Sequence, residues 1–130
     1  MSAPLLLHAA TRGGVWVVAL HGELDLATAR QLRDAVPAPS AGSGDEALVG
    51  AVIDLTECTF LDSTGARAIA SVGAGLQRQG VVVAVASRPG TMTSDVLEML
   101  GVRHLMAVEA DRSAAQANVL GGGHHSGTER

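Results

Sequence analysis

The chain has 130 residues, of which 47% are hydrophobic, 17% charged and only 2% aromatic, and its formal net charge is -4 at pH 7. This length suits one domain with a single core of moderate size, and the composition argues against a disordered chain. The negative net charge gives no electrostatic footprint for nucleic acid, whose binding depends on clustered Lys and Arg.

The N-terminal part of the chain begins with a predicted hairpin. Residues 5–10 and 15–20 have the composition of two strands, and a glycine-rich turn joins them. Residues 29–36 carry apolar side chains at helical spacing, and Pro37 ends this helix. The segment 37–50 contains prolines, serine, glycine and acidic residues, which predicts a surface loop.

The central part alternates between strand and helix patterns. Residues 51–55 form a short β-branched run that is typical of a buried central strand. A long helix is predicted over 63–79, and Gly80 ends it. Residues 81–86 form another buried strand. The packing face of the long helix is expected to consist of Ala66, Ile69, Ala70, Gly73 and Leu76.

The C-terminal part continues this alternation. A short helix is predicted over 93–100, a last strand over 104–108 and a last helix over 111–119, capped by Asp111 or Ser113. The short helix is expected to turn three side chains inward and to end at a glycine cap; these residues are Val96, Leu97 and Leu100, followed by Gly101.

Together these elements predict an α/β fold, with a mixed central sheet, an N-terminal hairpin and about four helices packed against the sheet. We expect one domain over 1–120 and a disordered tail over 121–130. The adjacent His124 and His125 in this tail have no fixed geometry for a metal, so the interpretation is a solvated tail and no metal site.

We expect a cytoplasmic protein without membrane insertion. No stretch approaches the roughly 20 apolar residues that a membrane-spanning helix needs. The apolar run within residues 1–10 lacks the preceding basic residues of a signal peptide. Cys58 is the only cysteine, so it has no partner in this chain for a disulfide, in agreement with a reducing compartment.

The segment Phe60-Leu61-Asp62-Ser63-Thr64-Gly65 marks a change from strand to helix. Unpaired backbone N–H groups and the helix dipole favour negative charge at such a helix start. A phosphoryl group on Ser63 could therefore be accommodated there. The same residues also fit a purely structural role, because Asp and Ser are preferred helix caps and either Asp62 or Ser63 could serve only as the cap.

Four segments, taken in order and spacing, resemble the STAS domain of bacterial anti-anti-sigma factors. They are Gly22-Glu23-Leu24-Asp25, Thr28-Ala29-Arg30-Gln31-Leu32, Val52-Ile53-Asp54-Leu55 and Phe60-Leu61-Asp62-Ser63-Thr64-Gly65. The resemblance covers residues 5–119, with a loop at 37–50 that is longer than in many members. It implies the STAS fold.

The resemblance also implies a role. The unphosphorylated protein would bind an anti-sigma factor of the histidine-kinase-like ATPase class and free its sigma factor. That kinase would phosphorylate Ser63 and be released, and a phosphatase would reverse the change. Ser63 is favoured by position, with Thr64 as the competing acceptor. The residue matching Asp25 lies close to the serine in the family.

The resemblance implies a partner-binding surface that combines both motifs with the exposed edge of the following helix. Gly65 is expected to let the helix start lie close to a partner's backbone. The predicted surface consists of Gly22, Glu23, Leu24, Asp25, Asp62, Ser63, Thr64, Gly65, Arg67 and Ser71.

No enzymatic motif accompanies these residues, so we expect a regulator that is not an enzyme and has no cofactor. The chain lacks the glycine-rich phosphate loop and the Gly-x-Ser-x-Gly nucleophile elbow. Cys58 is interpreted as a small buried residue because no Lys or Arg adjoins it. Two alternatives remain: a STAS subunit of a lipid-transport ABC system or larger signalling assembly, and a nucleotide-binding module or hydrolase.

Overall fold

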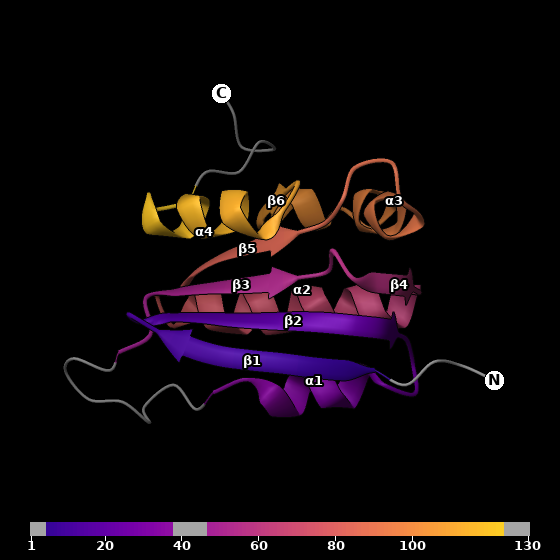
Figure 1. Cartoon of the computed structure of the whole chain (residues 1–130), viewed down its shortest axis with the longest axis horizontal. Helices are drawn as coiled ribbons and strands as arrows, with labels where there is room; N and C mark the ends of the chain where they lie inside the picture. The colour runs from indigo at the N-terminus through magenta and orange to yellow at the C-terminus, as the bar shows by residue number, and fades with distance from the viewer. Residues whose placement is uncertain (1–4, 38–46, 124–130) are drawn as a thin grey trace.

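A six-stranded mixed sheet organises the fold (Figure 1). The computed structural model describes residues 5–37 and 47–123. The strand order is β1-β2-β3-β5-β6, and β4 pairs separately with β2. β1 is antiparallel to β2, and every other pairing is parallel. The strands are β1 Leu6–Arg12, β2 Val15–Leu24, β3 Gly50–Asp54, β4 Cys58–Leu61, β5 Val82–Ala86 and β6 Ala107–Glu109.

The helices cover the two faces of this sheet unequally. Buried residues of α1, α2 and α3 join the larger core cluster on one face, and α2 passes behind the strands in Figure 1. α4 alone contributes to the smaller cluster on the other face, through Ala115 and Val119. The helices are α1 Ala29–Ala35, α2 Ser63–Arg78, α3 Met92–Met99, the short 3-10 helix η2 Val102–His104, and α4 Arg112–Leu120.

The predicted α/β fold with its N-terminal hairpin is confirmed. The turn between β1 and β2 needs glycine, because Gly13 and Gly14 have φ angles of 61° and 79°. On α2 the expected packing face is buried except for Ala70, which is half-buried. Gly73 lets this helix pack closely on the side chain of Met106, just before β6, since a Cβ there would lie 2.8 Å from the Met106 sulfur.

The predicted strand over 104–108 is present, but its first three residues lie outside it. Residues 102–104 form η2 instead, because Gly101 adopts a left-handed conformation and the chain tightens into hydrogen bonds such as His104 N–H to the Gly101 carbonyl, at 3.0 Å. Only Ala107–Glu109 join the sheet. Leu100 was also expected to face inward, but it is 40% exposed because α3 has already ended at Met99.

Two further differences concern strand boundaries. β4 was not predicted as a strand, although it leads directly into α2. Gly50 was placed in the surface loop, yet it is buried as the first residue of β3. Residues 38–46 of that loop, and His124 and His125 of the predicted tail, lie outside the described residues. No helix within residues 5–37 and 47–123 is long and apolar enough to cross a membrane.

Gly65 gives a direct test of how α2 begins. A Cβ at this position would meet the carbonyl oxygen of Leu24 and lie 2.9 Å from Cδ1 of Leu61. Gly65→Ala should therefore lower the free energy of unfolding by about 1–3 kcal/mol, as overpacking against rigid backbone does. Chemical denaturation measures this difference.

Gly75→Ala is the matched control in the same helix. The nearest atom to its added Cβ is Nη2 of Arg78 at 3.7 Å, so no atom has to move. This variant should be more stable than wild type by about 0.5–1 kcal/mol, because alanine favours helix. Equal stability of the two variants would contradict the close contact between Gly65 and β2.

Candidate partner-binding site

Parallel pairing brings the two predicted motifs together at one edge of the sheet. Leu24 at the end of β2 is the register partner of Leu61 at the end of β4. The Asp62 N–H donates to the Leu24 carbonyl at 3.4 Å. The segments 22–25 and 62–65 therefore lie side by side at the carboxyl ends of β2 and β4, although they are far apart in the sequence.

The sequence left open whether Asp62 or Ser63 caps α2, and the structure shows that Asp62 is the cap. Its carboxylate accepts a hydrogen bond from the Gly65 N–H at 2.8 Å. Ser63 is the first helical residue and is exposed. Its hydroxyl has no hydrogen-bond partner among the residues that the structure describes. The side chain is consequently open to solvent and takes no part in capping the helix.

The ten predicted surface residues divide by their exposure. Ser63, Arg67 and Ser71 are exposed and lie four residues apart, so they share one face of α2. Leu24 is fully buried, and Gly65 is buried against this chain's own β2. The backbone that Gly65 approaches closely is therefore that of Leu24, and not that of a partner as predicted. The other five are half-buried: Gly22, Glu23, Asp25, Asp62 and Thr64.

Asp25 has a structural role that the sequence pattern did not reveal. Its Oδ1 accepts hydrogen bonds from the Ala27 N–H at 3.0 Å and the Thr28 N–H at 3.2 Å. The Thr28 hydroxyl donates to the Glu23 carbonyl at 2.7 Å. These bonds fix the turn before α1 and hold Leu26 outward, 78% exposed. The spacing Asp-x-x-Thr is the signal that could have indicated this turn.

Cys58 lies beneath the site and is buried, as predicted. Its Sγ donates to the Phe60 carbonyl at 3.2 Å. Burial raises the pKa of the Cys58 thiol above its ordinary value. A thiol held in its neutral form is a poor nucleophile, so its environment suits a packing role.

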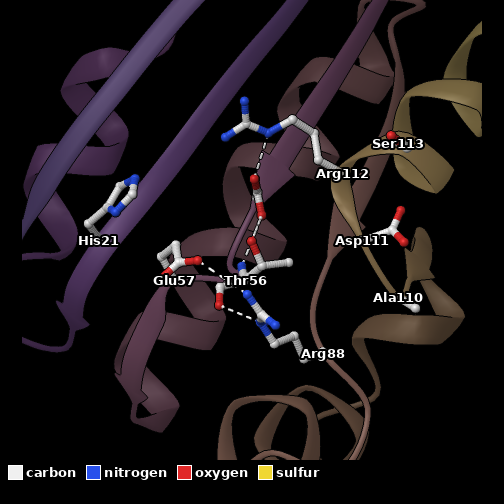
Figure 2. Close-up of a pocket in the computed structure, with 9 residues that line it drawn as sticks. His21, Thr56, Glu57, Arg88, Ala110, Asp111, Arg112 and Ser113 are labelled. Atoms are coloured by element: carbon white, nitrogen blue, oxygen red, sulfur yellow. Dashed lines mark hydrogen bonds and ion pairs between the residues drawn. The ribbon is translucent and has the colours of Figure 1, made fainter.

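A second polar cluster lines a pocket of about 510 Å³ at the carboxyl ends of β3 and β5 (Figure 2). Arg112 Nε pairs with Asp54 Oδ2 at 2.7 Å, and Thr56 donates its N–H and hydroxyl to Oδ1 of Asp54 at 2.9 and 2.7 Å. Arg88 pairs with Glu57 at 3.2 Å. The charges of this cluster therefore largely compensate one another.

Asp54 is the buried member of this cluster, and its ionisation is held by its partners. Burial by itself would raise the pKa of Asp54, but hydrogen bonds from Thr56 and the charge of Arg112 outweigh it and lower the pKa below its ordinary value. The carboxylate therefore stays charged and ties α4 to the end of β3. Within residues 5–37 and 47–123, no group of at least three His, Cys, Asp or Glu side chains could hold a metal.

This sheet, with its hairpin and the helix start beside the end of β2, defines the class of protein. The chain belongs to the STAS domain family, whose family model matches residues 7–115. A comparison with curated proteins gave no match.

Solved structures share this fold. An anti-sigma factor antagonist from Mycobacterium paratuberculosis is 25% identical with a TM-score of 0.75, over 92% of this chain and 99% of that chain. The anti-sigma factor antagonist SpoIIAA in its unphosphorylated form is 22% identical with a TM-score of 0.59, over 91% and 97%. The murine Solute Carrier 26 family member A9 anion transporter is 18% identical with a TM-score of 0.67; the match covers 86% of this chain but only 18% of the transporter.

The two residues at the start of α2 should differ in their effect on stability. Asp62→Ala removes the cap and should lower the free energy of unfolding by about 0.5–2 kcal/mol. Ser63→Ala removes an exposed hydroxyl without a partner, so its effect should stay within about 0.5 kcal/mol. Thermal melts followed by circular dichroism measure both. A larger loss for Ser63→Ala than for Asp62→Ala would show that Ser63 is the cap.

Proposed function

We propose that this chain is an anti-anti-sigma factor. Its unphosphorylated form binds an anti-sigma factor of the histidine-kinase-like ATPase class and thereby frees a sigma factor. The observation that carries the proposal is the exposed hydroxyl of Ser63, which has no partner among the described residues and lies at the first position of α2. Similarity to an anti-sigma factor antagonist along nearly its whole length supports this class of partner.

The surroundings of Ser63 suit a phosphoryl acceptor. Asp62 already caps the helix through the Gly65 N–H, so modifying Ser63 removes no hydrogen bond from the fold. The N–H groups of the first helical turn and the helix dipole favour the added negative charge. Thr64 is half-buried, which makes it the poorer acceptor. ATP binding and catalysis reside in the partner, and this chain acts as its substrate.

Release of the partner follows from electrostatics. Phosphorylation adds about -1.5 to -2 charges next to Asp62, just beyond the point where β4 pairs with the strand that contains Glu23. A partner that contacts this edge must then desolvate or repel the new charge. A penalty of about 1.4 kcal/mol weakens binding tenfold. A penalty a few times larger therefore releases the kinase. A phosphatase resets the switch.

The exposed residues around Ser63 define the contact surface of the proposal. Arg67 and Ser71 extend it along α2, and Leu26 adds an apolar side chain that is 78% exposed. Leu24 and Gly65 are buried and make no direct contact with the partner, but their contact holds the two motifs together. The proposed location is the cytoplasm, where a sigma factor and ATP are both available.

Binding by Ser63 variants tests this function. A Ser63→Ala bait should retain an anti-sigma factor ATPase from a lysate of the native cell, identified by mass spectrometry. Calorimetric titration with that purified partner should give wild-type affinity for Ser63→Ala. Ser63→Glu should bind at least tenfold more weakly, a loss of about 1.4 kcal/mol or more, while circular dichroism shows an unchanged fold.

Ser94→Glu is the matched control, because Ser94 lies in the first turn of α3 and the substitution changes the charge equally. It should bind as wild type does. Normal binding by a folded Ser63→Glu protein would contradict the proposed switch.

A further inference from the structure

Half of one sheet face lacks a covering helix among the described residues. α4 packs on β5, β3 and β6, on the face that it alone covers. On the same face, β1 and β2 form the floor of a pocket of about 540 Å³, here called the trough. Ala10 and Val17 are register partners in this floor, and Val15 lies beside them. Arg112, Gln116 and Leu120 of α4 form its wall, and Arg12 at the end of β1 also lines it.

The trough has the width of one helix. Neighbouring strands lie about 4.8 Å apart, and packed helices lie about 8–10 Å apart. α4 is centred on β5, and β2 is two strands away in the order β2-β3-β5. A helix beside α4 would therefore lie over β2, where it would cover the half-buried Val17, while Val15 is already packed in the cluster that contains Val119.

The outer surface of α4 is suited to burial. The sequence from Ser113 to Gly123 contains no charged residue. Ser113 and Ala117 are exposed, and Leu120 is 73% exposed. Helices that face solvent normally carry charged residues on that side, whereas a helix without them is typically covered. The same face of the molecule thus presents a helix with small side chains and, next to it, an empty position for such a helix.

We propose that this face binds a second copy of the chain. A twofold axis parallel to the strands, between α4 and its symmetry mate, inserts each α4 into the trough of the other copy. Ser113 and Ala117 then pack on the floor formed by Val15 and Val17 of the other chain. The small side chains permit the close approach, and both copies lose their uncovered sheet face at once.

The Arg12 end of the trough matches the C-terminal end of the inserted helix. α4 runs opposite to β3, since Arg112 bonds to Asp54 at one end and Gly50 lies against Val119 at the other. This places Arg12 of one copy at the C-terminus of the other copy's α4, whose last turn has no basic residue. Arg12 makes no ion pair with the described residues of its own chain. A cation is favourable beside a helix C-terminus.

Sedimentation equilibrium and light scattering of the full chain test this proposal. Wild type should have the mass of two chains. Leu120→Glu and Ala117→Glu should each halve that mass while circular dichroism stays unchanged, because both positions are exposed in the single chain. Leu105→Glu is the matched control on η2's side of the molecule and should remain dimeric.

Cross-linking identifies the particular arrangement. Gln116 faces its symmetry mate across the axis, so Gln116→Cys should form a disulfide-linked dimer on mild oxidation, while Ser71→Cys should not. A wild-type chain that stays monomeric at high concentration would overturn the proposal. So would a dimer that survives both glutamate substitutions. Ser63→Glu should stay dimeric, which separates this test from that of the proposed function.

Discussion

The contact between the start of α2 and the end of β2 is the constraint on which the candidate site depends. Gly65 lies against the Leu24 backbone so closely that no side chain fits between them. The pairing of Leu24 with Leu61 sets the register of this contact. As a result, Ser63 lies exposed on the protein surface beside the segment 22–25. Without this approach the two motifs would still be present in the sequence but would not form one surface.

The carboxylates around this edge have separate structural tasks. Asp62 caps α2, Asp25 fixes the turn before α1, and Asp54 ties α4 to the end of β3. Each is satisfied by hydrogen bonds within the chain. The exposed Ser63 hydroxyl, by contrast, has no hydrogen-bond partner among the described residues. The proposed switch relies on this difference, because a phosphoryl group on Ser63 would break none of these bonds.

Local patterns predicted the fold well where an element is long or bounded by glycine and proline, as for the hairpin and α2. They did not predict β4, because its four residues pair only with the far end of β2, through an irregular register between Gly22 and Glu23. The choice between Asp62 and Ser63 as cap stayed open because both residue types form caps. The burial of Leu24 depends on a contact with the distant Gly65, which one sequence does not reveal. The turn formed by Asp25 is local, and its signal is the spacing Asp-x-x-Thr.

The most direct measurement of the central claim is the position of the phosphoryl group. The purified chain should be incubated with ATP and the anti-sigma factor ATPase, and its intact mass and peptide map recorded. The account predicts addition of a single phosphoryl group at Ser63 and none when the ATPase is omitted. Incorporation mainly at Thr64, or modification of the chain by ATP alone, would contradict it.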